Sequence, residues 1–221
     1  EDSIEGWSDA FGVLISSYTE ENKFAPYYSQ PTFPEYQGYR VDFDLSLVRP
    51  AGSYIAGGFK APGADPLRKS LRLVEEMFER EFVLQNADRI NFRSILVYDT
   101  IMYGADCVIS GGVRRSATIC LFDKDDTEMM EAKTYENYNV LTGLNPQRGR
   151  SNNSVILLRD EVTKEEFDYI LSRVKDFGEP GFAFVDSVYT VYNPCLSGDS
   201  VVETTNGVFT MLELSNLSKD E

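Results

Sequence analysis

Residues 151–185 read SNNSVILLRDEVTKEEFDYILSRVKDFGEPGFAFV and decide the fold class of the chain. The apolar run Val155 to Leu158 predicts a buried strand. Thr163 and Glu166 have the spacing of a capping box, and the apolar residues after them recur at helical spacing, so a helix follows. A glycine-containing turn then leads into a second apolar strand, Phe182 to Val185. This order of strand, helix and strand is typical of an α/β fold with a largely parallel sheet.

The same alternation of helices and strands extends toward the N-terminus. Apolar residues at helical spacing predict helices over residues 2–18, 67–82 and 90–103. The alternation of apolar and acidic residues from Val41 to Val48 predicts a strand that is covered on one face. The apolar run Ile119 to Phe122 predicts a further strand of the sheet.

The tail from Cys195 to Glu221 differs in character from the rest of the chain. Two short β-prone runs flank Asn206 and Gly207, a pair that is suited to the positive φ angles of a tight hairpin turn. We therefore expect a β-hairpin and place a domain boundary between Pro194 and Cys195. The two domains are then residues 1–194 and 195–221.

The composition excludes several classes of function. The chain has 221 residues, of which 42% are hydrophobic and 26% charged, with no histidine, three cysteines and a formal charge of -15. Such an acidic surface argues against binding of DNA, RNA or anionic lipid, and no apolar stretch is long enough to span a membrane. The cysteines form no close pair, so neither a disulfide framework nor a metal site is expected. We expect a soluble, cytoplasmic piece of a longer protein.

Two glycine-rich loops that carry arginines are the candidate anion-binding sites. The first loop begins Arg49-Pro-Ala-Gly-Ser and continues through Lys60, and the second reads Ser110-Gly-Gly-Val-Arg-Arg-Ser. Glycine lets backbone amides approach a phosphate, and a guanidinium binds phosphate through paired donors. The alternative is that the glycines only turn the chain while the arginines stay solvated or pair with nearby carboxylates.

An ordered series of motifs resembles the large chain of ribonucleotide reductases, and most of all the adenosylcobalamin-dependent ribonucleoside-triphosphate reductases. The motifs are Asp2-Ser-Ile-Glu-Gly, Arg49-Pro-Ala-Gly-Ser-Tyr-Ile-Ala-Gly, Ser110-Gly-Gly-Val-Arg-Arg-Ser-Ala, Ser151-Asn-Asn-Ser, Gly178-Glu-Pro-Gly-Phe and Tyr192-Asn-Pro-Cys. The resemblance covers residues 1–194. It implies that this part of the chain belongs to the ten-stranded α/β barrel of these enzymes.

The resemblance also implies an allosteric site for a deoxynucleoside triphosphate. Asp2 and Ser3, at the start of a helix, would hold the effector's base and sugar, whereas Arg49, Ser53 and Lys60 would take its phosphates. The flexible loop between effector and substrate would then contain six named residues: Ser110, Gly111, Gly112, Arg114, Arg115 and Ser116. In Asp2-Ser-Ile-Glu we expect the acidic first residue to be the helix cap, because a glutamate follows three residues later.

The end of the resemblance carries the catalytic prediction. In the family, the asparagine matched by Asn193 positions the substrate, and the cysteine after it becomes a thiyl radical, followed by Gly-Glu. This chain instead continues Cys195-Leu-Ser-Gly-Asp-Ser into the predicted hairpin, which resembles the start of an intein of the Hint fold. Cys195 would then be the splicing nucleophile, whereas it would be the radical cysteine if no intein is present.

The predicted function is therefore that of a ribonucleotide reductase fragment interrupted by an intein, inactive as it stands. The resemblance implies a ribonucleotide substrate, a deoxynucleotide effector, adenosylcobalamin as cofactor and a thioredoxin-like reductant for the complete enzyme. It also implies a complementary intein segment and a C-terminal extein as splicing partners. Two alternatives stay open: a fragment of a diiron-dependent large subunit, and a split-intein precursor whose present activity is splicing alone.

Overall fold

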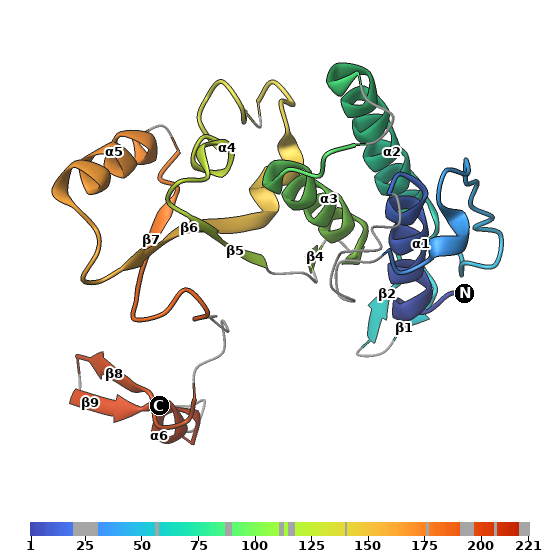
Figure 1. The fold of residues 1–221 in the computed structure, drawn as a ribbon. Helices are drawn as coiled ribbons and strands as arrows, with labels where there is room; N and C mark the ends of the chain where they lie inside the picture. The colour runs from blue at the N-terminus through green and yellow to red at the C-terminus, as the bar shows by residue number, and fades with distance from the viewer. Residues whose placement is uncertain are drawn as a thin grey trace. The chain divides into compact units, whose positions relative to one another are not determined.

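The computed structural model describes residues 1–19, 31–55, 58–86, 90–110, 113–114, 118–139, 141–175, 177–190, 197–205 and 207–216. The chain separates into two compact units, Glu1–Phe184 and Val185–Glu221 (Figure 1). The first unit contains helices and a small sheet, and the second contains a hairpin and a short helix. Among the described residues, no helix is long and apolar enough to cross a membrane.

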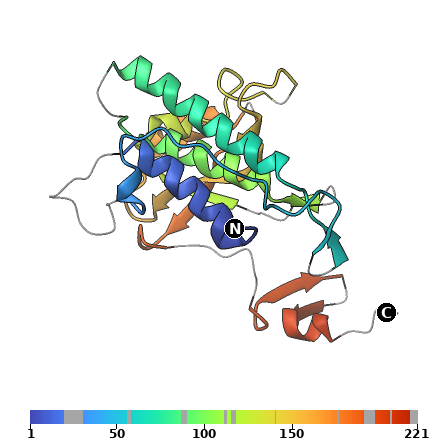
Figure 2. The same ribbon diagram turned by 90° about the vertical axis from the view of Figure 1, so that its right-hand side faces the viewer.

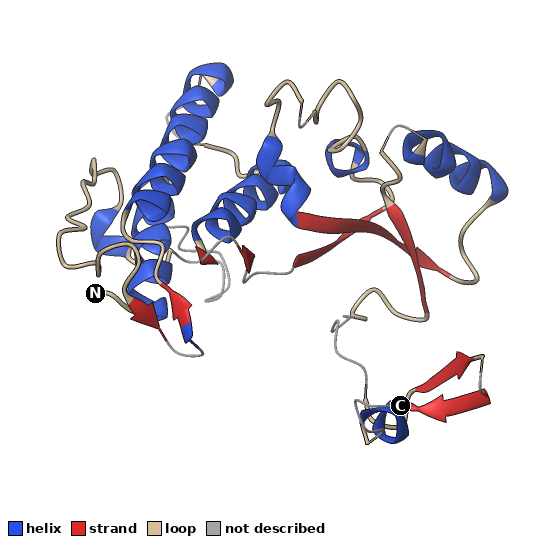
Figure 3. Ribbon diagram, turned by 180° about the vertical axis from the view of Figure 1, so that it is seen from behind, coloured by secondary structure: helices blue, strands red, loops and turns tan. Residues whose placement is uncertain are grey.

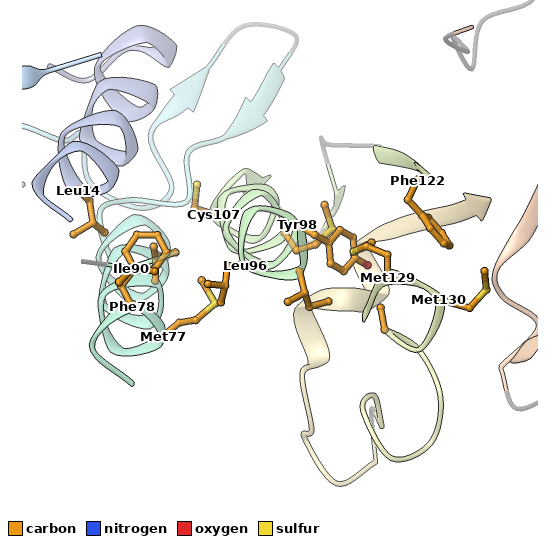
Figure 4. Packing of buried hydrophobic residues seen from close by; sticks show 14 of the residues in the cluster. Leu14, Met77, Phe78, Ile90, Leu96, Tyr98, Cys107, Phe122, Met129 and Met130 are labelled. Atoms are coloured by element: carbon orange, nitrogen blue, oxygen red, sulfur yellow. The ribbon is translucent and has the colours of Figure 1, made fainter. Parts of the chain in front are cut away.

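Three helices form one half of the first unit. They are α1 (Ile4–Ser17), α2 (Asp65–Gln85) and α3 (Ser94–Cys107). Figures 1 and 2 show α2 running beside both α1 and α3. Phe78 on α2 is fully buried, and its ring packs edge-on against Tyr18 and Phe92. Figure 4 shows these helices joined by one continuous apolar core that extends to Phe122 and Met130.

A three-stranded sheet forms the other half of the first unit, in the order β5, β6, β7 (Figure 3). The strands are β5 (Thr118–Asp123), β6 (Ser151–Leu158) and β7 (Gly181–Val185). β5 and β6 are parallel, in a register that pairs Thr118 with Ser151. The helix α5 (Lys164–Val174) connects β6 to β7, and its N-terminus carries the capping box predicted from the sequence. The α/β class is thereby confirmed, whereas membership of a ten-stranded barrel stays a prediction.

Short elements connect the helices to the sheet. Two small antiparallel ladders are formed by β1 (Tyr54–Ile55) with β2 (Phe59–Lys60), and by β3 (Ile109–Ser110) with β4 (Val113–Arg114). Single helical turns occur at η2 (Pro34–Tyr36), α4 (Thr127–Met130) and η4 (Pro146–Arg150). The last of these leads directly into β6.

The second unit contains the hairpin that the sequence predicted. Strand β8 (Val201–Thr204) pairs antiparallel with β9 (Gly207–Thr210), and Gly207 has a φ of 127° at the turn. Helix α6 (Met211–Ser215) follows immediately and begins with a capping box between Thr210 and Glu213. The assignment of this hairpin to an intein, and the domain boundary at Pro194, stay predictions.

The structure corrects two expectations about the helical half. Residues 41–48 form an irregular segment instead of a strand, because no neighbouring segment pairs with them among the described residues. Their apolar side chains Val41, Phe43 and Leu45 still pack against the core, which explains the alternating pattern. The helix expected over residues 90–103 is α3, which begins at Ser94 and ends at Cys107.

Candidate functional site

The N-terminus of α1 and the first glycine-rich loop meet through Asp2 and Arg49. The Arg49 Nε donates to Asp2 Oδ2, and the backbone N of Arg49 lies 3.3 Å from the same oxygen. The Arg49 Nη2 also donates to the Asp2 carbonyl oxygen at 3.3 Å. The hydrogen bond from the guanidinium holds the pKa of the Asp2 carboxyl below its ordinary value. Two residues predicted for one effector site, which are far apart in the sequence, thus lie in contact.

Ser3 caps the helix that carries this site. Its hydroxyl accepts a hydrogen bond from the backbone N of Gly6 at 3.0 Å. The expectation that Asp2 is the cap is therefore wrong by one residue. Because Ser3 is the cap, the carboxylate of Asp2 points to Arg49. The first turn of α1 offers the positive end of a helix dipole.

The glycine-rich loop after Arg49 is closed by its own hydrogen bonds. The backbone N of Gly52 donates to the Ala61 carbonyl at 3.0 Å, and the backbone N of Ala61 donates to the Ser53 carbonyl at 2.7 Å. The Ser53 hydroxyl donates to the Pro50 carbonyl at 2.8 Å. Lys60 lies on β2 and pairs in register with Tyr54. Ser53 therefore lies directly before the ladder of β1 and β2, and Lys60 lies within it.

Gly63 closes this loop, so its replacement by alanine should destabilise the chain. Gly63 has a φ of 78°, and an added Cβ would lie 2.9 Å from the backbone N of Ala51. Gly52 is the matched control, because its φ is 87° but an added Cβ meets nothing within 4 Å. We expect Gly52→Ala to lower the free energy of unfolding by about 1 kcal/mol, and Gly63→Ala to lower it by about 1 kcal/mol more because of the overlap.

Urea denaturation followed by the fluorescence of Trp7 measures both changes. Trp7 is the single tryptophan of the chain and packs against the core, so it reports on the first unit. Equal losses for the two variants would show that the contact with Ala51 does not constrain the loop.

A cavity of about 620 Å³ is lined mainly by residues of α1 and by residues 35–48. Trp7, Phe43 and Leu45 contribute to its apolar lining. Its charged lining residues are Glu1, Asp9, Glu35, Arg40, Asp42 and Asp44. With carboxylates in such excess over its one arginine, the cavity repels phosphate. Arg49 does not line this cavity.

The second glycine-rich loop is described only in part. Backbone pairing joins Ile109 to Arg114 and Ser110 to Val113, so the segment starts and returns as an antiparallel ladder directly after α3. Gly111, Gly112, Arg115 and Ser116 lie outside the described residues, as do the side chains of Ser110 and Arg114. Asn193 and Cys195, the predicted catalytic residues, also lie outside the described residues.

A buried polar network that the sequence did not indicate lies between α3 and the start of β6. Arg148 forms a two-pronged ion pair with Asp99, with Nε to Oδ1 at 2.9 Å and Nη2 to Oδ2 at 2.7 Å. The Tyr98 hydroxyl lies 2.8 Å from Ser151 Oγ and accepts from Asn153 Nδ2 at 3.2 Å. Burial raises the pKa of this hydroxyl to about 12. The network fixes the residues of the Ser-Asn-Asn-Ser motif against α3.

The motifs at 151–154 and 178–181 are linked through Glu179. Its Oε2 accepts a hydrogen bond from the backbone N of Asn153 at 3.0 Å and lies 2.6 Å from Lys133 Nζ. The Lys133 ammonium also donates to the Ser151 carbonyl at 2.6 Å. Burial lowers the pKa of Lys133, against the opposing effect of Glu179. Lys133 and Glu179, which form a partly buried ion pair, are thus both hydrogen-bonded to the start of β6.

The two cysteines in the described residues have the character of packing residues. Cys107 is buried and Cys120 is partly buried, and burial raises the pKa of both thiols to about 11. Both are therefore protonated and poorly nucleophilic at neutral pH. Within the described ranges, no cluster of carboxylate and cysteine ligands could hold a metal ion.

Comparison with known proteins identifies distant homologues of one kind. A probable adenosylcobalamin-dependent ribonucleoside-triphosphate reductase of Dictyostelium discoideum is 27% identical over 192 residues, which are 85% of this chain and 21% of the relative. The Lactobacillus leichmannii adenosylcobalamin-dependent ribonucleoside-triphosphate reductase is 28% identical over 93% of this chain and 25% of its own length. The Euglena gracilis protein of the same name is 31% identical over 67% of this chain and 19% of its own length.

The matches cover most of this chain but only a small part of each relative. The chain spans about a quarter or less of the length of these relatives. The Lactobacillus match covers 93% of the 221 residues of this chain, which is more than the 194 residues that end at Pro194. The match therefore extends beyond Pro194. No family model and no solved structure matches the chain.

Proposed function

We propose that residues 1–194 are a fragment of the catalytic barrel of an adenosylcobalamin-dependent ribonucleotide reductase that includes its effector site, and that residues 195–221 begin an intein. The contact between Asp2 and Arg49 supports the first half of this proposal most directly, because the resemblance assigns both residues to one effector site. The names of the distant homologues support the reductase chemistry and its cofactor.

The effector in this proposal is a deoxynucleoside triphosphate. Arg49 is 44% exposed, so its guanidinium can exchange part of its contact with Asp2 for a phosphate oxygen. The first turn of α1 adds to the positive potential at this point. Because the chain carries a formal charge of -15, this local donor set has to overcome a repulsive field.

Replacing Arg49 by alanine should therefore weaken effector binding. Losing a charged hydrogen-bond donor to phosphate should raise the dissociation constant of a deoxynucleoside triphosphate by about tenfold or more. Titration calorimetry on the chain with each of the four deoxynucleoside triphosphates measures the change. Arg72→Ala is the control, because Arg72 forms an exposed ion pair with Glu76 within α2. If the wild type binds the nucleotide and Arg49→Ala binds it equally tightly, Arg49 does not belong to the site.

The complete enzyme in this proposal replaces the ribose 2′-hydroxyl of a ribonucleotide by hydrogen. Adenosylcobalamin supplies the radical that starts this chemistry. We assign none of the described residues to the cofactor. Asn193 would position the substrate, and a thioredoxin-like dithiol would restore the reduced enzyme after each turnover.

Splicing is the second activity, favoured by the run Cys195-Leu-Ser-Gly-Asp-Ser directly before the hairpin of β8 and β9. In the proposed splicing step, the Cys195 thiolate attacks the Pro194 carbonyl carbon. A C–S bond forms, the Pro194–Cys195 C–N bond breaks, and the Cys195 nitrogen takes up a proton as a free amine. A complementary intein segment would supply the proton donor, because this chain has no histidine.

A further inference from the structure

The contact between Asp2 and Arg49 occupies only one edge of the guanidinium. The Arg49 Nε donates to Asp2 Oδ2, and Nη2 donates to the Asp2 carbonyl oxygen at 3.3 Å. Among the described residues, nothing accepts a hydrogen bond from the Arg49 Nη1. A guanidinium carries its N–H groups in a planar fork with more than one edge. The edge formed by Nη1 and Nη2 is therefore available to a second ligand.

Asp2 holds the backbone of Arg49 as well as its side chain. The backbone N of Arg49 lies 3.3 Å from Asp2 Oδ2, the oxygen that also accepts from Nε. Pro50 follows directly and restricts the backbone of Arg49 to extended conformations. On the other side of the contact, the Glu1 carbonyl oxygen would lie 2.5 Å from a Cβ added at Gly6, so the segment that carries Asp2 lies against the first turn of α1. The carboxylate thus limits the directions in which the guanidinium can point.

The Asp2 carboxylate has two opposing effects on a phosphate that binds Arg49. Its negative charge repels the phosphate, although solvent screens part of this repulsion because the Asp2 and Arg49 side chains are 22% and 44% exposed. Its hydrogen bonds also order the Arg49 side chain, which then loses less conformational entropy when it binds a ligand. Variants that change the charge and the hydrogen bond separately can distinguish the two effects.

We propose that Asp2 is a positioning residue for the effector phosphates, because it holds Arg49 by the Nε edge and leaves the Nη1 edge to bind a phosphate through paired N–H donors. This inference rests on the proposed function. Paired donors are the geometry in which a guanidinium binds phosphate most strongly. The role differs from the contact with base and sugar that the resemblance implies, since Asp2 acts through Arg49. The hydrogen bond at Nε is kept when the phosphate binds.

Titration calorimetry on the chain compares Asp2→Ala with Asp2→Asn. Both variants remove the same charge, but only asparagine keeps an oxygen that can accept from the Arg49 Nε. The probes are inorganic tripolyphosphate, which has neither base nor sugar, and the deoxynucleoside triphosphate that the wild type binds most tightly. We expect Asp2→Ala to bind both probes about fivefold more weakly than Asp2→Asn does. A contact with the sugar, or the charge alone, would give the two variants equal dissociation constants for tripolyphosphate.

The difference between the two Asp2 variants should disappear when Arg49 is replaced. In the Arg49→Ala background, Asp2→Ala and Asp2→Asn should bind either probe equally. A fivefold difference that persists in this background would show that Asp2 does not act through Arg49. The matched controls are Asp168→Ala and Asp168→Asn, which change an exposed pair with Lys164 on α5 and should bind both probes as the wild type does.

Arg49→Lys tests the same geometry if Asp2→Ala does not fold. Lysine keeps the charge but has no second edge, so one ammonium has to serve both Asp2 and the phosphate. We expect this variant to bind tripolyphosphate about fivefold more weakly than the wild type does. Wild-type affinity in Arg49→Lys would contradict the use of two edges.

The outcomes separate this inference from the proposed function. If the wild type binds a deoxynucleoside triphosphate while Asp2→Ala and Asp2→Asn bind tripolyphosphate equally tightly, the positioning role of Asp2 alone is overturned. A wild type that binds neither tripolyphosphate nor any deoxynucleoside triphosphate overturns the effector site and this inference together.

Discussion

Replacing Asp99 by alanine should lower the free energy of unfolding by about 3–5 kcal/mol. The variant leaves the Arg148 guanidinium buried without its carboxylate, and it also removes the acceptor of the hydrogen bond from Gln147 Nε2, at 3.0 Å. An uncompensated buried charge is the costliest consequence of breaking such a pair. Among the side-chain interactions in the described residues, this one should therefore give a large single loss of stability.

Urea denaturation followed by Trp7 fluorescence measures the loss. Asp168→Ala is the matched control, because Asp168 is 55% exposed and pairs with Lys164 one helical turn away. Such an exposed pair contributes about 0.5 kcal/mol or less. If Asp99→Ala cost no more than Asp168→Ala, the polar network between α3 and β6 would not stabilise the fold.

Replacing Cys195 by alanine should abolish splicing completely. The proposed acyl shift needs a thiol on the residue whose own amide is broken, and alanine has no nucleophile. The chain is mixed with a complementary intein segment joined to a C-terminal extein, and the ligated product is sought by mass spectrometry. The wild type should give the product and Cys195→Ala should give none.

The other two cysteines provide the controls for this experiment. Cys107→Ala and Cys120→Ala should splice as the wild type does, because burial keeps both thiols protonated. Product from Cys195→Ala would refute the intein assignment. Absence of product from every variant would favour the alternative in which Cys195 is the radical cysteine of the reductase.

Local sequence patterns predicted the secondary-structure elements better than they predicted which segments pair or pack with one another. The capping box of α5 and the Asn-Gly hairpin depend on neighbouring residues, so the sequence alone located both. The prediction of a strand over residues 41–48 was wrong, because the alternation of apolar and acidic residues indicates only which side chains are buried. A strand also needs a hydrogen-bonding neighbour, and among the described residues none pairs with this segment, whose apolar residues pack against the core.

The candidate site shows the same limit. Asp2 and Arg49 could be assigned to one site through the resemblance, but their direct contact depends on the cap lying at Ser3. The pairing of Asp99 with Arg148 spans 49 positions of the sequence. Neither residue lies in a motif that marks it, since acids and arginines are common in this chain and only the packing of α3 on η4 brings them together.

The dependence of the complete protein on adenosylcobalamin tests the central claim most directly. The protein that contains this chain, freed of any intein, is incubated with a ribonucleoside triphosphate and a dithiol reductant, with and without adenosylcobalamin. Deoxyribonucleotide is then quantified by chromatography. The proposed function predicts product only when adenosylcobalamin is present, whereas product formed without it, or none formed with it, would contradict the proposal.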